Sequence, residues 1–309
     1  MRIRRLVLAS LFAAAPAAAG TPTPAQDLLR SPGINAPIVG GGNATVGQFP
    51  TTVALDLGGG LCTGTLLTPN WVLTAAHCID PEVLGQPTET ITANLQVHFD
   101  TVNIFQSAGI TVGATEIFKH PSFSVNALGN HDIGLIHLDT PVTDRTPVPI
   151  NQAAADAPVG IDLQLVGFGA TSRTNPASAG VLRFVDQTSV SCSIVGLPDS
   201  SLLCWSQTNG KGKCEGDSGG PSFATIDGKL VQVGIASFAD QQCQQLGADT
   251  RIDAELDFLL THLTQCELDN NCDDGKDDGG CCSTGSAGAP TAGLGVFAIA
   301  FGLRRRRRR

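Results

Sequence analysis

Residues 216–221 read Gly-Asp-Ser-Gly-Gly-Pro, a serine enclosed by glycines that let the backbone turn tightly where a side chain would clash. Upstream, residues 74–78 read Thr-Ala-Ala-His-Cys and residues 131–136 read His-Asp-Ile-Gly-Leu-Ile. A serine hydroxyl is a weak nucleophile at neutral pH, so it needs a base to take its proton and a carboxylate to hold that base in one tautomer. The chain offers all three groups, in one of several orders known for such triads: His77, Asp132 and Ser218.

These segments resemble the motifs of the chymotrypsin/trypsin family of serine endopeptidases, and the resemblance covers about residues 38–265. The family fold is all-β: two packed six-stranded antiparallel β-barrels with a C-terminal helix and the active site in the cleft between the barrels. The resemblance implies barrels at about residues 38–145 and 146–252 and a helix at 253–264. The residues favour the same class, because short apolar runs alternate with Gly, Pro and Asn and few windows have helical periodicity.

The resemblance also implies roles for individual residues. Ser218 would be the nucleophile, His77 the general base and later the acid for the leaving amine, and Asp132 the carboxylate that orients His77. The backbone N–H groups of Gly216 and Ser218 would form the oxyanion hole, and Ser237 matches the family serine that hydrogen-bonds the triad aspartate. The remaining histidines are expected to be structural: His98, His120, His131, His137 and His262.

Activation is expected to involve the start of the first barrel, where residues 38–41 read Ile-Val-Gly-Gly. In the family, cleavage frees an ammonium at this position, which would pair here with the carboxylate of Asp217. The residue before the expected cut is Pro37, whereas a trypsin-like activator needs Arg or Lys there. The activating protease is therefore unknown. The rival function is a latent binding protein on the same fold, which never frees Ile38.

The substrate pocket departs from the trypsin pattern. Gly212 stands where trypsin-like members carry the aspartate that selects Arg and Lys, and Lys213 follows it. Asp249 would lie near the pocket base, where pairing with Lys213 would offset the cost of burying a charge. An apolar or small substrate side chain is the first expectation; basic specificity through Asp249 and acidic specificity through Lys213 are the alternatives. The expected pocket residues are Gly212, Lys213, Glu215, Ser237, Phe238, Ala239, Gly247 and Asp249.

The chain has ten cysteines. With a secretion signal present, disulfides are the default state, but six cysteines in the body allow fifteen pairings, and the residues alone do not choose among them. The resemblance implies three pairs: Cys62–Cys78, Cys192–Cys204 and Cys214–Cys243. Cys266 and Cys272 are free to pair with each other if Cys281 or Cys282 anchors the chain.

Charge and composition exclude several function classes. Residues 38–265 hold 8 Lys and Arg against 21 Asp and Glu, a net charge of −13, which argues against nucleic acid as a partner. The body has neither Cys-x-x-Cys pairs nor histidine clusters in sequence, so no metal site is expected, and no cofactor. The expected partners are protein or peptide substrates.

The two ends of the chain are predicted to direct its export. Residues 1–19, with a basic start, an apolar run and a small-residue end, are typical of a signal peptide, and residues 20–37 of a propeptide or spacer. An acidic linker at 266–286 contains cysteines, and an apolar segment with an arginine cluster follows at 287–309.

This tail resembles a bacterial C-terminal sorting signal of the MYXO-CTERM type, in which a cysteine motif precedes a short apolar helix and an arginine cluster. Sorting or membrane machinery would then act on it and leave the protein at the cell surface. A membrane stub that stays in place is the alternative, because an arginine run would hold its end on the cytoplasmic side. A calcium loop from Asp269 onward is not favoured, because Asp274 stands where such a loop needs glycine.

Overall fold

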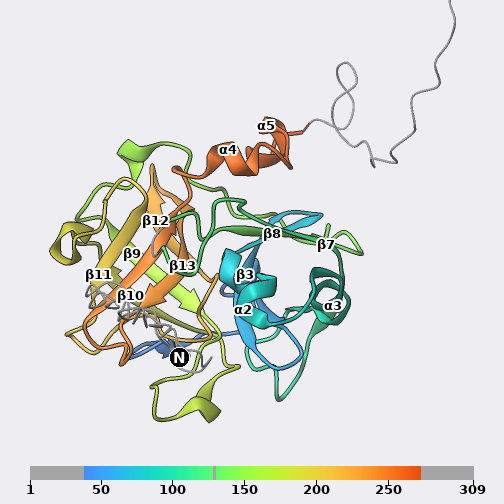
Figure 1. Ribbon diagram of the computed structural model, residues 1–309, viewed down its shortest axis with the longest axis horizontal. Coiled ribbons are helices and arrows are strands. Elements are labelled where there is room, and N and C mark those ends of the chain that lie inside the picture. The colour runs from blue at the N-terminus through green and yellow to red at the C-terminus, as the bar shows by residue number, and fades with distance from the viewer. Residues whose placement is uncertain (1–37, 128–129, 273–309) are drawn as a thin grey trace, which may run out of the picture. The chain divides into compact units, whose positions relative to one another are not determined.

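A computed structural model describes residues 38–127 and 130–272, which belong to one compact unit (Figure 1). The expected signal peptide, the expected propeptide and the tail beyond Cys272 lie outside these described residues. No helix within the described ranges combines the length and the apolar character that a membrane span requires.

The described chain forms two antiparallel sheets of seven strands each. The first sheet has the order β6-β5-β2-β3-β4-β8-β7, and every pairing in it is antiparallel. Its strands are β2 (Thr52–Asp56), β3 (Leu61–Thr68), β4 (Trp71–Thr74), β5 (Gln96–Phe99), β6 (Ile110–Val112), β7 (Ala114–Lys119) and β8 (Gly134–Leu138).

The second sheet has the order β1-β10-β9-β12-β13-β14-β11. Its strands are β1 (Gly42–Asn43), β9 (Asp162–Gly167), β10 (Arg183–Thr188), β11 (Leu202–Ser206), β12 (Pro221–Ile226), β13 (Lys229–Ala239) and β14 (Leu246–Arg251). The all-β fold of two curled antiparallel sheets is thus confirmed. Each sheet has one strand more than the resemblance implied, and the shortest strands are β1 and β6.

Helices are few and short, as the scarcity of helical periodicity predicted. They are η1 (Ala76–Cys78), α2 (Pro81–Leu84), α3 (Thr88–Asn94), η2 (Ala154–Asp156), η3 (Pro176–Ser178), η4 (Cys192–Val195), α4 (Leu256–Leu259) and α5 (Gln265–Leu268). The expected C-terminal helix is present as α4, which is shorter than the predicted range. Its end tightens, because Thr261 N and His262 N donate to carbonyls three residues back rather than four.

The core explains why the C-terminal segment packs where it does. Trp71 and Leu135 of the first sheet belong to the same buried cluster as Phe258, Leu259 and Leu263, which follow the second sheet in sequence. Burial of large apolar side chains contributes about 1.5–3 kcal/mol each relative to exposure. The C-terminal segment is therefore attached to the first sheet, and its N-terminal residue, Glu255, lies close to the segment that precedes β8.

Four disulfides are present among the described residues: Cys62–Cys78, Cys192–Cys204, Cys214–Cys243 and Cys266–Cys272. The first three join the cysteines that the resemblance paired. Four disulfides in a chain of this size are typical of an extracellular protein.

Candidate active site

His77 and Asp132 meet at one end of the first sheet. His77 lies in η1, directly after β4, and its backbone N–H donates to Asp132 Oδ1 at 3.0 Å. Its ring Nδ1 lies 2.8 Å from Asp132 Oδ2, which also accepts a hydrogen bond from the Ser237 hydroxyl at 2.6 Å. Asp132 is 4% exposed, so these donors replace the water that burial removes. The histidine is held by both its backbone and its ring.

The electrostatic surroundings favour the charged form of His77. Burial by itself lowers the pKa of His77, but the negative charge of Asp132, its hydrogen bond to the ring and the charge of Asp80 outweigh burial and raise the pKa above 6.5. An imidazole with a raised pKa is a stronger base for a hydroxyl proton.

The loop that carries Ser218 is clamped onto strand β3 of the other sheet. Thr63 N donates to Ser218 O at 2.8 Å, and the Thr63 hydroxyl donates to Gly216 O at 3.0 Å. Gly219 has a φ of 78°, and a Cβ there would lie 2.0 Å from Thr74 Oγ1, so only glycine fits this close approach. These contacts explain why the sequence needs glycine beside this serine.

His77, Asp132 and Ser218 line one cavity of about 540 Å³. The same cavity is lined by Lys213, Glu215, Gly216, Ser237, Phe238, Ala239 and Asp249. Two other predicted pocket residues pack against buried side chains instead. A Cβ on Gly212 would lie 1.8 Å from Gln207 Oε1, and one on Gly247 would lie 2.5 Å from the Trp205 ring.

Asp217 is fully buried directly beside Ser218. Its Oδ1 accepts from Gly169 N at 2.9 Å and its Oδ2 from Cys214 N at 3.1 Å. Burial raises the pKa of Asp217 to about 7, although these hydrogen bonds and the charges of Lys213 and Arg183 oppose that shift. Because burial disfavours the charged form of Asp217, one further cation beside it would stabilise the ionised carboxylate.

The segment at Ile38 and Val39 lies against the segment that carries Gly212. Ile38 is fully buried, and Val39 exchanges two backbone hydrogen bonds with Gly212, at 2.8 and 3.1 Å. The segment that was expected to insert after cleavage is therefore already packed next to the residue that precedes Lys213.

Lys213 and Asp249 form a buried ion pair and both line this cavity. The Lys213 ammonium donates to Asp249 Oδ2 at 2.8 Å, Ser222 Oγ at 2.9 Å and Gly220 O at 3.0 Å, which uses all three of its protons. The Ser222 hydroxyl donates in turn to Asp249 Oδ2. Burial lowers the pKa of Lys213 and raises that of Asp249, while their mutual attraction opposes both shifts. The two charges neutralise each other.

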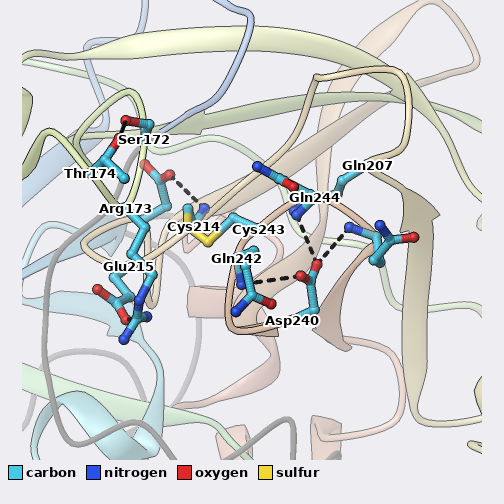
Figure 2. The surroundings of a disulfide bond; sticks show 12 residues. Ser172, Arg173, Thr174, Gln207, Cys214, Glu215, Asp240, Gln242, Cys243 and Gln244 are labelled. Atoms are coloured by element: carbon cyan, nitrogen blue, oxygen red, sulfur yellow. Dashed lines mark hydrogen bonds and ion pairs between the residues drawn. A yellow bond between two sulfur atoms is a disulfide. The ribbon is translucent and has the colours of Figure 1, made fainter.

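Figure 2 shows the Cys214–Cys243 disulfide, which ties the segment before Ser218 to the loop after β13. Asp240, 6% exposed, holds this loop. Its Oδ1 accepts from three successive backbone N–H groups at 2.7–3.0 Å, and its Oδ2 from a fourth at 3.2 Å; the donors are Gln242, Gln244, Gln245 and Leu246. Asp240 was not among the predicted site residues, although an aspartate at the start of a short polar loop is a common turn signal.

The Asp240→Ala variant is expected to raise KM about tenfold while changing kcat less. Four N–H groups lose their acceptor, and water replaces it imperfectly, at a cost of about 1–3 kcal/mol to the ordered loop. Steady-state kinetics with one peptide substrate measure the effect. Asp186→Ala, on the exposed part of β10, is the control. An unchanged KM in Asp240→Ala would show that the loop is ordered by the disulfide alone.

Arg173 and Glu215 form an ion pair, drawn in Figure 2, at the rim of the same cavity. Arg173 comes from the loop between β9 and β10, and Glu215 immediately precedes Gly216. Both side chains are partly exposed, so the pair is screened by water and contributes little to stability.

Comparison with known proteins gives a consistent result. The sequence model of the Trypsin family matches residues 38–259. Brachyurin of Leptuca pugilator is 30% identical over 233 residues, covering 72% of this chain and 97% of that protein. Serine protease SP24D of Anopheles gambiae is 32% identical over 219 residues, 69% of this chain and 75% of that protein. Chymotrypsin-like elastase family member 1 of Canis lupus familiaris is 30% identical over 225 residues, 67% and 83% of the two chains.

Proposed function

Because the chain belongs to the trypsin family and is a serine endopeptidase, we propose that Ser218, His77 and Asp132 are its catalytic triad. The observation that carries this proposal is the geometry around His77. Its ring is hydrogen-bonded to a buried carboxylate, and it lines the same cavity as a serine that stands in a glycine-framed turn. The substrates are peptide bonds of proteins or peptides.

In the proposed mechanism, Ser218 Oγ attacks the carbonyl carbon of the scissile bond as His77 takes the hydroxyl proton. The negative oxygen that forms is stabilised by the N–H groups of Gly216 and Ser218. His77 then gives the proton to the leaving amine, which leaves an acyl group on Ser218. Water attacks this ester while His77 takes one of its protons, and His77 then gives that proton to Ser218 Oγ as the acid product departs. Asp132 stays ionised and holds the imidazole in one tautomer.

Hydrolysis of a protein substrate tests this proposal. The mature protein should cleave it. Ser218→Ala should retain only the acceleration that substrate binding and the oxyanion hole provide, which is about 10³–10⁴-fold over the uncatalysed reaction in water. A Ser218→Ala variant that cleaves as fast as the parent protein would show that another group is the nucleophile.

We propose that cleavage after Pro37 activates the enzyme. The freed ammonium of Ile38 would pair with the buried carboxylate of Asp217 and order the oxyanion hole. Support comes from the burial of Ile38 and Asp217 and from the pairing of Val39 with Gly212. The protease that makes this cut is unknown, and the latent binding protein is not favoured.

We propose that residues 1–19 direct export and that the tail at 287–309 is a sorting signal or anchor that retains the protein at a bacterial cell surface, as the tail's resemblance implies. The four disulfides support the export step, since such bonds persist in oxidising compartments. The domain at 38–265 would then act outside the cell.

A panel of chromogenic peptides that vary only in the residue before the cut bond should show a preference for uncharged, apolar or small side chains. The Lys213 ammonium donates all three of its protons to groups of the protein itself, and Asp249 is neutralised by Lys213. Neither residue therefore presents its full charge to a substrate. Peptides with Arg or Glu should react at least about tenfold more slowly, a difference of about 1.4 kcal/mol. A preference for Arg would instead make Asp249 the selector.

A further inference from the structure

Two imidazoles and one carboxylate lie together near Asp132, the proposed catalytic aspartate. His120 follows β7, His131 directly precedes Asp132, and Glu255 directly precedes α4. His131 Nδ1 lies 3.0 and 3.1 Å from the two carboxylate oxygens of Glu255, and His120 Nε2 lies 3.7 Å from Glu255 Oε2. One ligand atom from each residue lies within 4.8 Å of the other two.

The chemistry of this cluster suits a divalent transition metal. Glu255 is 3% exposed, and its ion-pair partners in the described chain are the two imidazoles rather than Lys or Arg. Two imidazole nitrogens and one carboxylate oxygen are a donor set that zinc(II) prefers when it keeps its fourth position open. Zinc bonds of 2.0–2.1 Å in a tetrahedron separate neighbouring ligand atoms by about 3.3 Å. The distances from the two imidazole nitrogens to Glu255 Oε2, 3.0 and 3.7 Å, lie on either side of that value, and all three ligand atoms lie within 4.8 Å of one another.

An ion can reach the cluster, but the rings must adjust to bind it. The His131 side chain is 42% exposed, which leaves one side of the cluster open to solvent. The two rings are stacked with an interplanar angle of 8°, so at least one must tilt before both nitrogen lone pairs point at a common ion. Zinc at His120 Nε2 also moves the ring proton to Nδ1, which now accepts from Ser122 N at 3.1 Å. Binding is therefore expected to be weaker than at a structural zinc site.

We propose that His120, His131 and Glu255 form a zinc(II) site with one open, water-filled position, and that zinc bound there inhibits the peptidase. The inhibitory arm rests on the proposed role of Asp132. His131 directly precedes Asp132, so the ring movement that aligns His131 with an ion also acts on the neighbouring carboxylate. Asp132 Oδ2 must keep its 2.8 Å contact with His77 Nδ1 to hold the ring in place, and a displaced Asp132 orients the proposed base less well.

The site differs from the second group of possible metal ligands found among residues 38–127 and 130–272. Cys62, His77 and Cys78 also lie close together, but the two cysteines form a disulfide and offer no thiolate. Glu255 is distant in sequence from the two histidines, 124 positions after His131. For that reason the sequence did not show the three residues as one cluster.

Calorimetric titration of the mature protein with zinc chloride tests the site without relying on activity. One zinc per chain is expected. His131→Asn should weaken binding by at least about tenfold, because it removes a ligand; asparagine tolerates the φ of 58° at this position. Glu255→Gln should act in the same direction, with circular dichroism to check its fold.

Two controls make the titration specific. His137→Asn, which removes an imidazole elsewhere on the first sheet, should bind zinc like the parent protein. His77→Ala should also bind one zinc. No saturable binding, binding that His131→Asn leaves unchanged, or binding lost in His77→Ala would each overturn the proposed site.

Inhibition is measured separately, as the ratio of kcat with and without zinc in each variant. Zinc should lower kcat of the parent protein, and the effect should vanish in His131→Asn. Zinc that binds without changing kcat would overturn the inhibitory arm. A protein inactive even without zinc would count against the proposed triad, and the titration would still decide on the zinc site.

Discussion

Asp132→Asn is expected to lower kcat about 10⁴-fold with little change in fold. Asp132 Oδ2 faces the ring Nδ1 of His77 at 2.8 Å and accepts the Ser237 hydroxyl at 2.6 Å. An amide that places its NH2 group there would donate to Nδ1, so the ring would carry its proton on Nε2 instead. The nitrogen that should take the Ser218 proton would then already be protonated.

The pH profile of kcat/KM gives an independent reading of the same variant. Activity needs neutral His77, so it should rise with pH through the pKa of that group, which lies above 6.5 because Asp132 and Asp80 outweigh burial. Asp132→Asn removes the main raising influence and leaves burial, which lowers the pKa. The acid limb of its residual activity should therefore move to lower pH.

Ser237→Ala serves as the matched control, because it removes one donor from Asp132 and keeps the contact with His77. Its kcat should fall about 10- to 100-fold, the range expected for one hydrogen bond to a charged group. Asp132→Asn activity within tenfold of the parent protein would contradict the assignment of Asp132.

Release of Ile38 is expected to switch the enzyme on, with an increase in kcat/KM of at least about 100-fold. Breaking a buried ion pair by removing one partner costs about 3–5 kcal/mol, and the proenzyme lacks the ammonium of the pair proposed with Asp217. Without that partner, burial keeps the pKa of Asp217 at about 7, so much of it is protonated near neutral pH. Replacement of residues 20–37 by a removable tag that leaves Ile38 as the first residue allows both forms to be assayed.

Two variants make this experiment specific. A protein that retains one extra alanine before Ile38 after tag removal should stay at the proenzyme level, because its ammonium is displaced. Asp217→Asn with a free Ile38 should also stay low. Equal activity of the tagged and released proteins would show that this enzyme does not use its N-terminus for activation.

The sequence predicted the parts of this protein that short motifs encode. The segments around His77, Asp132 and Ser218 were enough to predict the family and the two-sheet fold, both of which are confirmed. Each of these motifs joins a chemical group to the turn or strand end that positions it. The assignment of their catalytic roles, and the domain boundaries, stay predictions.

Long-range contacts were not predictable in the same way. Glu255 reads as an unremarkable acid before a leucine-rich segment, and its contact with His131 depends on how the C-terminal segment packs against the first sheet. Gln207 explains why Gly212 lacks a side chain, yet the Gln207 amide position follows from the packing of Trp205. The strands β1 and β6 pair through only a few backbone groups. They are too short for their side chains to show the alternating pattern from which a strand is predicted.

The most direct test of the central claim is labelling of the mature protein with a fluorophosphonate, followed by mass spectrometry of its peptides. The reagent reacts with a serine hydroxyl only when a nearby base activates it. One label should appear, on Ser218, and it should be lost in His77→Ala. Label on another residue, or equal labelling of Ser218 in His77→Ala, would contradict the assigned nucleophile and base.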